Sequence, residues 1–380
     1  MTCQEFPLTG RHLSAMRSTT FAKQSRRGNC PVTGILQSKI EDITGGHKAL
    51  LTHSCTAALE MAAILCELKA GDEVIMPSFT FVSTANAVVL QGATPVFVDI
   101  DPATLNIDPE ATLAAITPRT KAIFAVHYAG FPADMVRLRE IADAHNCLLV
   151  EDAAQALGSS LNGQPCGGMG DLAAFSFHET KNIISGEGGA LVVNREDLIE
   201  RAEIIREKGT NRSVFLKGLV DKYTWVDIGS SFLPGELVAS FLYAQLEQFE
   251  EIYNRRLALF DRYMEALTPL EEEKRLRLPK KSNASEGNGH MFYLLLDDMQ
   301  DRDAVIDYMQ AEESGTPFHY IPLHSAPAGQ KFARTHGSLS VTDDVSSRLV
   351  RLPMHFDLGT DIEVVVAKAH EYLSRASTPS

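Results

Sequence analysis

The sequence predicts an α/β protein, with a mainly parallel sheet in a large domain and a smaller C-terminal domain of the α+β type. Short apolar, β-branched runs alternate with longer amphipathic stretches from about Ala49 to Gln245. Beyond that point the alternation stops, and a long helical stretch leads to a new apolar run. A chain of 380 residues is also longer than one average domain. We therefore expect two lobes.

The predicted strands of the large domain are almost continuously apolar, as expected where helices cover both faces of a parallel sheet. In chain order they span residues 49–54, 73–76, 95–99, 122–128, 148–152, 172–177 and 189–193. Amphipathic helices are predicted over residues 56–68, 134–145 and 195–208. Gly209 follows the last of these helices, and glycine is a common residue just past a helix end.

The smaller domain is predicted to begin with a helix over residues 248–267. A polar, charge-rich loop over residues 271–289 separates this helix from an apolar strand over residues 291–296. We place the domain boundary between residues 248 and 249. Residues 1–248 then comprise an N-terminal segment and the large domain, and residues 249–380 form the small domain.

Composition and charge restrict the class of protein. The chain has 44% hydrophobic and 22% charged residues, which is typical of a globular protein with a sizeable core. A net charge of −14 argues against a nucleic-acid or anionic-membrane partner, because such partners require a basic surface. The six cysteines form no CxxC pair, and no apolar run approaches the roughly 18 residues of a membrane span. With no secretory signal pattern at the N-terminus, we expect a cytoplasmic protein.

A dinucleotide-binding Rossmann domain is the main alternative for the large lobe. That fold requires GxGxxG directly after a strand and at the start of a helix. Neither GGMG (167–170) nor GEGG (186–189) has this spacing. The sequence therefore argues against nicotinamide chemistry.

Lys181 is the first candidate for chemistry. It lies beyond the predicted strand in FSFHETKN (175–182) and before the turn GEGG (186–189). A lysine held by a packed sheet can form a Schiff base with a carbonyl when its surroundings keep part of it neutral. An isolated lysine at such a place is most often a solvated loop residue, so the interpretation depends on its neighbours.

Asp152 ends the predicted strand in LVEDAAQ (149–155). A carboxylate at the end of an apolar strand is unfavourable unless a cation neutralises it, and a protonated pyridine nitrogen is such a cation. A helix cap or a structural hydrogen-bonding group is the alternative. The position of Asp152, one strand before Lys181, favours the cofactor role.

The segment THSCTA (52–57) joins a strand to the start of a helix. Free N–H groups and the helix dipole make such a place an anion site, suited to a phosphate. Capping of the helix by Ser54 or Thr56 explains the same residues, and the two roles are compatible. Ser176, five residues before Lys181, can add a hydroxyl donor to the same phosphate.

Several separate motifs occur in an order that resembles the DegT/DnrJ/EryC1/StrS sugar aminotransferases. They are SCTAAL (54–59), PSFTFVST (77–84), HYAG (127–130), EDAAQ (151–155), SFHETKN (176–182) and GEGG (186–189). The resemblance covers roughly residues 30–375. It implies fold type I of the pyridoxal-phosphate enzymes, the aspartate-aminotransferase fold, with residues 1–248 holding the cofactor-binding domain.

The resemblance also implies pyridoxal 5′-phosphate as cofactor and gives roles to individual residues. Lys181 matches the lysine that forms the Schiff base, and Asp152 matches the partner of the pyridine nitrogen. Gln155 matches the amide near the cofactor's phenolic oxygen, and Phe81 matches the ring that stacks on the pyridine. The matched residues of the phosphate cup are Ser54, Cys55, Thr56, Ala57 and Ser176.

Two segments depart from the family pattern. Many relatives have Gly-x-Asn-x-Arg, in which the Asn reaches the phosphate of the partner subunit. This chain has GSSFL (229–233), so Ser231 stands in the place of the Asn, where its hydroxyl can still donate a hydrogen bond. The segment RGNCPVTG (27–34) also differs from the glycine-rich stretch that relatives have near the substrate, so it implies no particular sugar.

The segment FHYIPLH (318–324) in the small domain resembles the family's His-Tyr-x-Pro-x-His motif. The resemblance implies substrate contacts from Tyr320 and His324, and from His178 beside the lysine. A structural histidine in a proline-bounded turn explains His324 equally well. No metal ion is implied.

The expected function is transfer of an amino group, from L-glutamate, to C4 of a dTDP-4-keto-6-deoxyhexose, giving dTDP-4-amino-4,6-dideoxygalactose. Amination at C3, or of a UDP- or GDP-linked keto sugar, stays open within the family. Lys181 argues against the dehydratase branch, in which a histidine replaces the lysine. A non-catalytic pyridoxal-binding regulator is a remote alternative. The resemblance further implies a homodimer with shared active sites, and the apolar helical run 237–246 is a candidate interface.

Overall fold

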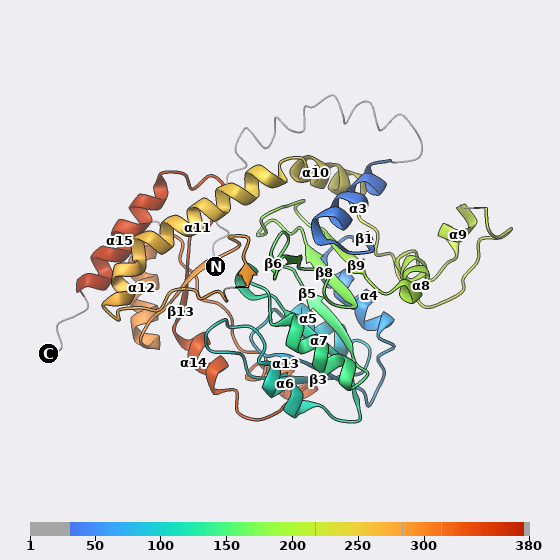
Figure 1. Ribbon diagram of the computed structural model, residues 1–380, viewed down its shortest axis with the longest axis horizontal. Helices are drawn as coiled ribbons and strands as arrows, with labels where there is room; N and C mark the ends of the chain where they lie inside the picture. The colour runs from blue at the N-terminus through green and yellow to red at the C-terminus, as the bar shows by residue number, and fades with distance from the viewer. Residues whose placement is uncertain (1–30, 217, 283, 313, 376–380) are drawn as a thin grey trace.

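The computed structural model describes residues 31–216, 218–282, 284–312 and 314–375, and Figure 1 shows its arrangement. Within these residues, the strands are β1 (Lys48–Thr52), β2 (Glu73–Pro77), β3 (Thr94–Val98), β4 (Thr120–Val126), β5 (Leu148–Asp152), β6 (Ser160–Leu161), β7 (Gln164–Pro165), β8 (Leu172–Ser176), β9 (Gly189–Val193), β10 (Ser285–Glu286), β11 (Phe292–Leu295), β12 (Arg334–Thr335) and β13 (Leu349–Leu352).

The helices between them mostly follow the strands in alternation. They are α3 (Pro31–Thr44), α4 (Cys55–Leu65), α5 (Val82–Val89), α6 (Pro109–Ala115), α7 (Met135–Ala144), α8 (Glu196–Arg206), α9 (Arg212–Leu216), α10 (Glu236–Leu246), α11 (Phe249–Glu272), α12 (Met299–Ala311), α13 (Pro327–Phe332), α14 (Ser340–Arg348) and α15 (Asp361–Arg375), with a 3-10 turn η1 (Tyr128–Gly130). None of the helices in the described part of the chain is long and apolar enough to cross a membrane.

The large sheet has eight strands in the order β1-β9-β8-β5-β4-β2-β3-β12. Strand β9 runs antiparallel to both of its neighbours, β1 and β8, and all other pairs are parallel. The predicted α/β class with a mainly parallel sheet is therefore confirmed. Within a parallel set the carboxyl ends of the strands lie at one edge, and this edge is where ligands bind in such sheets.

Both faces of the sheet are covered by helices, which explains the continuous apolar runs. On β2, Val74 and Met76 pack with α4 and α5, whereas Ile75 between them faces the other side and packs with α7. This alternation follows from the period of two in a strand. Helices α3 and α10 cover the same side as α7, over β1, β8 and β9.

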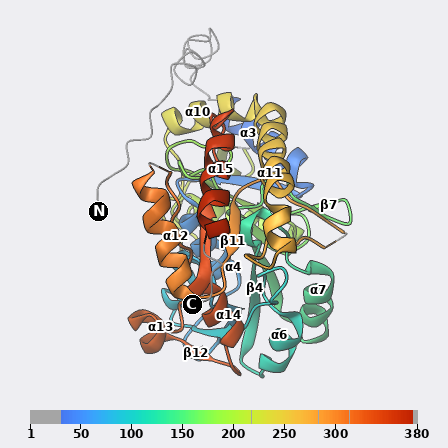
Figure 2. The same cartoon turned by 90° about the vertical axis from the view of Figure 1, so that its left-hand side faces the viewer.

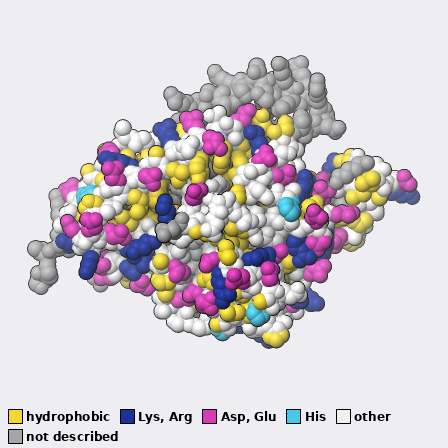
Figure 3. Space-filling view, viewed as in Figure 1, with side chains coloured by type: hydrophobic (Ala, Val, Ile, Leu, Met, Phe, Trp, Pro, Cys, Tyr) yellow, Lys and Arg dark blue, Asp and Glu magenta, His cyan; other side chains and the backbone are white. Residues whose placement is uncertain are grey.

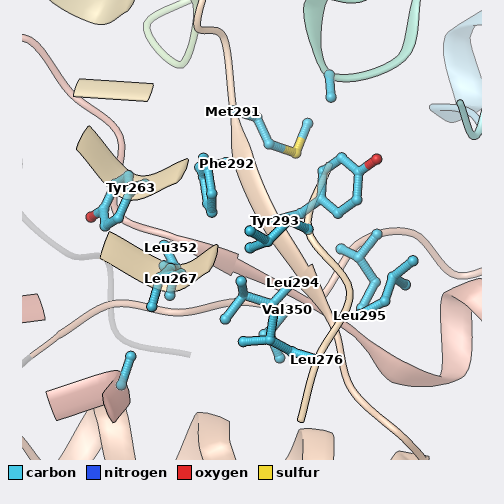
Figure 4. Packing of buried hydrophobic residues seen from close by; sticks show 14 of the residues in the cluster. Tyr263, Leu267, Leu276, Met291, Phe292, Tyr293, Leu294, Leu295, Val350 and Leu352 are labelled. Carbon is cyan, nitrogen blue, oxygen red and sulfur yellow. The ribbon is translucent and has the colours of Figure 1, made fainter. Parts of the chain in front are cut away.

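A second core lies among the C-terminal elements. Strands β11 and β13 form an antiparallel pair, and helices α11, α12 and α15 lie around it (Figure 2). Figure 4 shows the packing, with Phe292 and Tyr263 on one side of β11 and the ring of Tyr293 on the other. The core continues to Phe79 and Tyr128, which precede α5 and begin η1. The side chains of β11 are thus buried against elements of the large sheet.

Several boundaries differ from the sequence prediction. His127 and Tyr128 leave strand β4 early and enter the turn η1, because the chain bends there with Ala129 at φ 57°. The predicted loop 271–289 contains the end of α11 and the short strand β10. Gly209 does follow α8, with φ +70°, and its N–H donates to the Ile204 carbonyl at 2.9 Å. Short strands such as β6, β7 and β10 lack the length to give a periodic pattern.

Candidate active site

The predicted residues meet at the carboxyl edge of the large sheet. Asp152 is the last residue of β5, and Ser176 is the last residue of the neighbouring strand β8. Lys181 follows in the turn after β8, where its N–H donates to the His178 carbonyl at 2.9 Å. Helix α4 begins at the same edge, directly after β1. The fold therefore brings together segments that are more than a hundred residues apart in the chain.

Asp152 is a buried carboxylate held by two hydrogen bonds. The Thr84 hydroxyl donates to Oδ2 at 2.6 Å, and the Ala154 N–H donates to Oδ1 at 3.3 Å. Burial raises the pKa of the Asp152 carboxyl, and these hydrogen bonds and the charge of Lys181 oppose that shift. No residue of the described chain forms a salt bridge with Asp152 within 4.0 Å. The carboxylate is thus oriented and is suited to a cationic partner from a ligand.

Lys181 is partly buried, and Cys55, Asp152 and Arg351 act on it electrostatically. Burial lowers the pKa of its amine, whereas Cys55 and Asp152 act in the opposite direction and Arg351 adds to the lowering. A lower pKa increases the fraction of neutral amine, which is the nucleophilic form. The structure therefore places the Lys181 amine within electrostatic reach of Asp152.

The start of α4 provides donors for an anion. Ser54 is the N-cap of this helix, and its hydroxyl accepts a hydrogen bond from the Ala57 N–H at 3.1 Å. The N–H groups of Cys55 and Thr56 are in the first turn, where no helical carbonyl can accept them. The Thr56 hydroxyl lies 2.8 Å from that of Ser83 on α5. Capping by Ser54 therefore leaves the N–H groups of Cys55 and Thr56 available for an anion.

Gly189 explains how Ser176 reaches this cup. It pairs with Thr52 on one side and with Ser176 on the other. A Cβ atom on Gly189 would lie 2.4 Å from the Ser54 carbonyl carbon and 2.5 Å from the Cys55 nitrogen. Only glycine lets β9 approach the start of α4 so closely. The motif GEGG thus has a structural reason, and it places Ser176 next to the anion site.

Phe81 lies at the start of α5, and Gln155 follows Asp152 by three residues. Phe81 is the N-cap of α5, the helix that also bears Thr84, and its side chain is 58% exposed. An exposed ring at this place is available for stacking. Gln155 accepts a hydrogen bond from the Ala129 N–H at 2.7 Å and donates to the Tyr320 hydroxyl at 2.9 Å. Tyr320 is therefore brought to the site, as predicted, with its own hydroxyl proton still free to donate.

Three other predicted residues form local contacts. The Nδ1 atom of His178 lies 3.0 Å from the Thr180 hydroxyl, and its Nε2 atom faces Glu187. His324 contacts the Ser78 hydroxyl at 2.8 Å and Asp343 at 3.2 Å, which matches the structural alternative for this histidine. Ser231 is exposed and forms a backbone bridge with Glu207. The structure does not place these three side chains on Lys181.

Residues missed by the sequence analysis complete the site. The Tyr128 hydroxyl lies 3.0 Å from Nδ1 of His319, and His290 Nδ1 lies 3.0 Å from the Asn182 amide oxygen. Burial lowers the pKa of His319 to about 2, so this ring is neutral. Arg351 on β13 acts electrostatically on Lys181 and on these groups. Tyr128, Asn182 and His319 lie in motifs quoted above, but their pairings had no signal in the sequence, and His290 and Arg351 lie outside those motifs.

A cluster beneath the site has the composition of a metal centre. His127, Glu151 and Cys166 are buried, and their ligand atoms lie within 4.8 Å of one another. The Nδ1 atom of His127 accepts a hydrogen bond from the Ala133 N–H, so we assign the ring proton to Nε2, which donates to Glu151 at 2.9 Å. The Glu151 oxygens also accept the N–H groups of Gly167, Met169 and Gly170. The side-chain nitrogens of His127 and the carboxylate oxygens of Glu151 are therefore occupied by hydrogen bonds. Those of Glu151 fix the turn at residues 167–170.

The residues fit a pyridoxal phosphate on these observations. The buried carboxylate without a described ion-pair partner suits the pyridine nitrogen, and the exposed ring of Phe81 suits its face. The first turn of α4 suits the phosphate. A family model for the DegT/DnrJ/EryC1/StrS aminotransferases matches residues 19–369. The chain belongs to this family.

Solved structures agree with this assignment to the DegT/DnrJ/EryC1/StrS family. The aminotransferase TlmJ from Streptoalloteichus hindustanus is 29% identical, with a TM-score of 0.87, over 97% of this chain and 98% of that one. DesV from S. venezuelae is 30% identical, with a TM-score of 0.86, over 97% and 95%. A putative sugar aminotransferase from Streptococcus pneumoniae, in its PLP-form, shares the fold at 24% identity and a TM-score of 0.86, over 98% of both chains.

Membership of this sugar-aminotransferase family makes the chain an enzyme that transfers amino groups with pyridoxal phosphate. The fold is that of fold type I, as the sequence predicted.

Proposed function

We propose that the protein transfers an amino group from L-glutamate to C4 of a dTDP-4-keto-6-deoxyhexose, forming dTDP-4-amino-4,6-dideoxygalactose. Support for this acceptor comes from three segments that resemble the corresponding transaminase: SCTAALEMAA (54–63), REKGTNRS (206–213) and DKYTWVDIGSS (221–231). Amination at C3, or of a UDP- or GDP-linked sugar, is the alternative within the same family.

The observation on which the catalytic part of the proposal rests is the pair of Asp152 and Lys181 at one sheet edge. Bound pyridoxal phosphate supplies an electron-accepting pyridine ring that stabilises negative charge at the substrate carbon. Asp152 would hold the pyridine nitrogen protonated, because its buried carboxylate gains a cation there. Thr84 fixes the orientation of that carboxylate through its 2.6 Å hydrogen bond.

Lys181 would hold the cofactor and then move protons. Burial lowers the pKa of its amine, so the neutral form can accept a proton from the substrate carbon. The protonated amine can then donate that proton to another carbon of the reacting molecule. Ser54, Thr56 and Ser176 lie around the start of α4, where they would hold the phosphate. Phe81 would cover one face of the ring. Gln155 and Tyr320, which are joined by a 2.9 Å hydrogen bond, would lie near its phenolic oxygen.

We propose that the enzyme is a cytoplasmic homodimer. Residues 207–216 and 218–233, here called the arm, contain α9 and project from the body in Figure 1, and hydrophobic side chains lie on the surface of the arm in Figure 3. Its large exposed side chains include Leu219 at 71% and Trp225 at 78% exposure, and Leu237 on the neighbouring helix α10 is 72% exposed. Exposed apolar groups of this number are typical of a surface that another chain covers.

A spectroscopic titration tests the proposed function. The purified protein with pyridoxal phosphate is placed in a cuvette, L-glutamate is added, and dTDP-4-keto-6-deoxyglucose follows. We expect a visible band of lysine-linked cofactor that glutamate converts to the pyridoxamine form and the sugar restores. Lys181→Ala should lack the lysine-dependent band. A band that glutamate converts but this sugar does not restore would reject the proposed acceptor and direct the search to other nucleotide sugars.

The same titration separates the enzyme from a non-catalytic cofactor-binding protein. A regulator would bind pyridoxal phosphate and show the band, but glutamate would not convert it. Absence of the band in the wild-type protein would contradict the role of Lys181 itself.

A further inference from the structure

The turn at residues 177–186, here called the lysine turn because it carries Lys181, is joined to the C-terminal elements by Asn182. The amide nitrogen of Asn182 donates to the Asn288 carbonyl at 2.9 Å, and its amide oxygen lies 3.0 Å from Nδ1 of His290. The Lys181 N–H, by contrast, donates within the turn. The side chain next to Lys181 thus connects the lysine turn with a segment more than a hundred residues away in the chain.

Hydrogen bonding determines which nitrogen of His290 carries the proton. Because the Asn182 amide nitrogen donates to a carbonyl, the Asn182 oxygen faces the imidazole, and an amide oxygen only accepts. We therefore assign the proton to Nδ1 of His290, which donates to Asn182. Burial lowers the pKa of His290 well below its ordinary value, and the charge of Lys181 acts in the same direction. The ring is thus a neutral donor toward the lysine turn.

Asn288 joins the same segment to the chain that follows Asp152. Its amide nitrogen donates to the carbonyls of Gln155 at 2.8 Å and Leu157 at 3.0 Å, and its amide oxygen accepts the His290 N–H at 3.0 Å. Asn288 is 1% exposed, so water does not compete for these bonds. The backbone of His290 is therefore fixed relative to Gln155.

Gly130 in η1 leaves the space that Asn288 occupies. A Cβ on Gly130 would overlap the Asn288 amide oxygen and would lie 3.0 Å from the His290 Cβ. Gly130 also has φ +83°, a conformation that residues with a Cβ rarely adopt. The motif HYAG (127–130) and the segment before β11 are therefore packed closely together at Asn288.

We propose that Asn288 and His290 are positioning residues for the reaction, which hold the lysine turn in a fixed place relative to Gln155. This inference rests on the proposed roles of Lys181 and Gln155, which would contact two different atoms of one bound cofactor and must therefore keep one spacing. An error of about 1 Å in such a spacing can cost on the order of 100-fold in rate. Both positioning residues act through their neighbours, since His290 bonds to Asn182 and Asn288 bonds to the Gln155 backbone.

Two substitutions of His290 separate its hydrogen bond from the volume of its ring. His290→Phe keeps a ring and removes the Nδ1 donor, whereas His290→Asn keeps a donor nitrogen at the corresponding place on a smaller side chain. The matched control is His370→Phe, because His370 on α15 donates to the Ala266 carbonyl of α11 at 2.7 Å. This control removes a comparable hydrogen bond from the second core.

Hydrogen exchange of the full-length protein, followed by mass spectrometry with and without pyridoxal phosphate, reports on the lysine turn independently of turnover. Without the cofactor, we expect the amides of residues 178–186 to exchange on the order of tenfold faster in His290→Phe, because the turn opens more often once the bond to Asn182 is lost. His290→Asn should restore most of the protection, and His370→Phe should leave these amides unchanged. Equal exchange of these amides in wild type and His290→Phe would overturn the proposal. Faster exchange throughout the protein would also overturn it, in favour of a general structural role.

The reaction of the loaded enzyme with glutamate alone gives the second readout. The maximal rate at which glutamate converts the lysine-linked band should fall on the order of tenfold in His290→Phe, with the half-saturating glutamate concentration unchanged, because the change misplaces Lys181 and not the donor. His290→Asn should recover most of this rate. A rise in the half-saturating concentration at an unchanged maximal rate would show that His290 binds the donor and would reject the positioning role.

Asn182→Leu makes the same test from the lysine turn itself, and it decides the question if His290→Phe does not fold. The double variant should react no more slowly than Asn182→Leu, since that change has already removed the bond to His290. Losses that multiply in the double variant would contradict the link between the two side chains. A wild-type band that glutamate does not convert would contradict the proposed function, whereas the exchange experiment tests the positioning role alone.

Discussion

At the scale of single residues, the candidate site depends on the carboxylate of Asp152, which has no salt-bridge partner among the described residues. Asp152 is buried, and Thr84 and the Ala154 N–H orient it. Burial raises its pKa, so a cation that binds there lowers it again and gains free energy in doing so. Asp152 is thus suited to a bound cation such as the protonated pyridine nitrogen of the cofactor.

Asp152→Asn should therefore keep the protein folded and lower kcat by about 10²–10³-fold, the range for removing one electrostatic group from a reacting centre. Thr84→Val retains the carboxylate and should lower kcat by about tenfold. Steady-state kinetics with saturating cofactor, supported by circular dichroism, checks both variants. A kcat of Asp152→Asn close to that of wild type would remove Asp152 from the mechanism.

The sequence allowed prediction of Asp152 and Lys181 because Asp152 ends an apolar strand, Lys181 follows another, and the ends of neighbouring parallel strands meet. Thr84 lies within a motif that was recognised, yet its hydrogen bond to Asp152 spans 68 positions and has no local signal. The same holds for His290 and Arg351, which enter the site from the C-terminal elements. For His324, the structure shows contacts to Ser78 and Asp343 that a linear pattern cannot reveal.

At the scale of elements, the anion site depends on how closely β9 approaches α4. Gly189 lies between Thr52 and Ser176 and touches the backbone of Ser54 and Cys55. Strand positions and the start of α4 were predictable from apolar runs and the capping residue. The antiparallel direction of β9 was not, because strand direction is set by the connections and leaves no trace in composition.

Gly189→Ala should weaken the binding of pyridoxal phosphate by about tenfold or more, since the added methyl would force the first turn of α4 away from β9. Cofactor affinity measured by fluorescence quenching tests this. The control is Gly34→Ala, where a Cβ would meet nothing within 4 Å. If the two variants bind the cofactor equally well, the close approach has no role in the phosphate cup.

At the scale of the whole molecule, the C-terminal part of the chain returns to the large sheet. Strand β12 pairs with β3, and Arg334 on β12 contacts the buried Glu73 of β2, which also binds Arg119. These contacts lower the pKa of Glu73 to about 2. The boundary at residues 248 and 249 remains a prediction, and β12 shows that the chain beyond it contributes to both cores.

Glu73→Gln should lower the free energy of unfolding at pH 7 by about 2 kcal/mol. Because the folded-state pKa lies below the ordinary value of 4.5, the contribution of Glu73 is complete above pH 4.5 and is lost as the pH falls toward 2. Urea denaturation at several pH values tests this, and the variant should show a flatter dependence in that window. Glu67→Gln, which alters an exposed pair with Arg201, should change stability by under about 1 kcal/mol.

The arm is the second feature at this scale. Replacing Leu219 and Trp225 by Asp should shift the protein toward the monomer in light scattering coupled to gel filtration, because both side chains are exposed apolar groups on the arm. Phe332→Asp on α13, another exposed ring, should not change the mass. A wild-type protein that is already monomeric would contradict the proposed homodimer.

The buried Arg256 has a consequence for engineering of this enzyme. Its guanidinium donates to the carbonyls of Gly289, His290 and Met354, and so joins the segment before β11 to the turn after β13. His290 and the end of β13 are therefore held in place by one side chain of α11. Libraries that alter the acceptor specificity should leave this arginine unchanged, since a substitution there would also shift His290, which contacts Asn182 beside Lys181, and confound the selection.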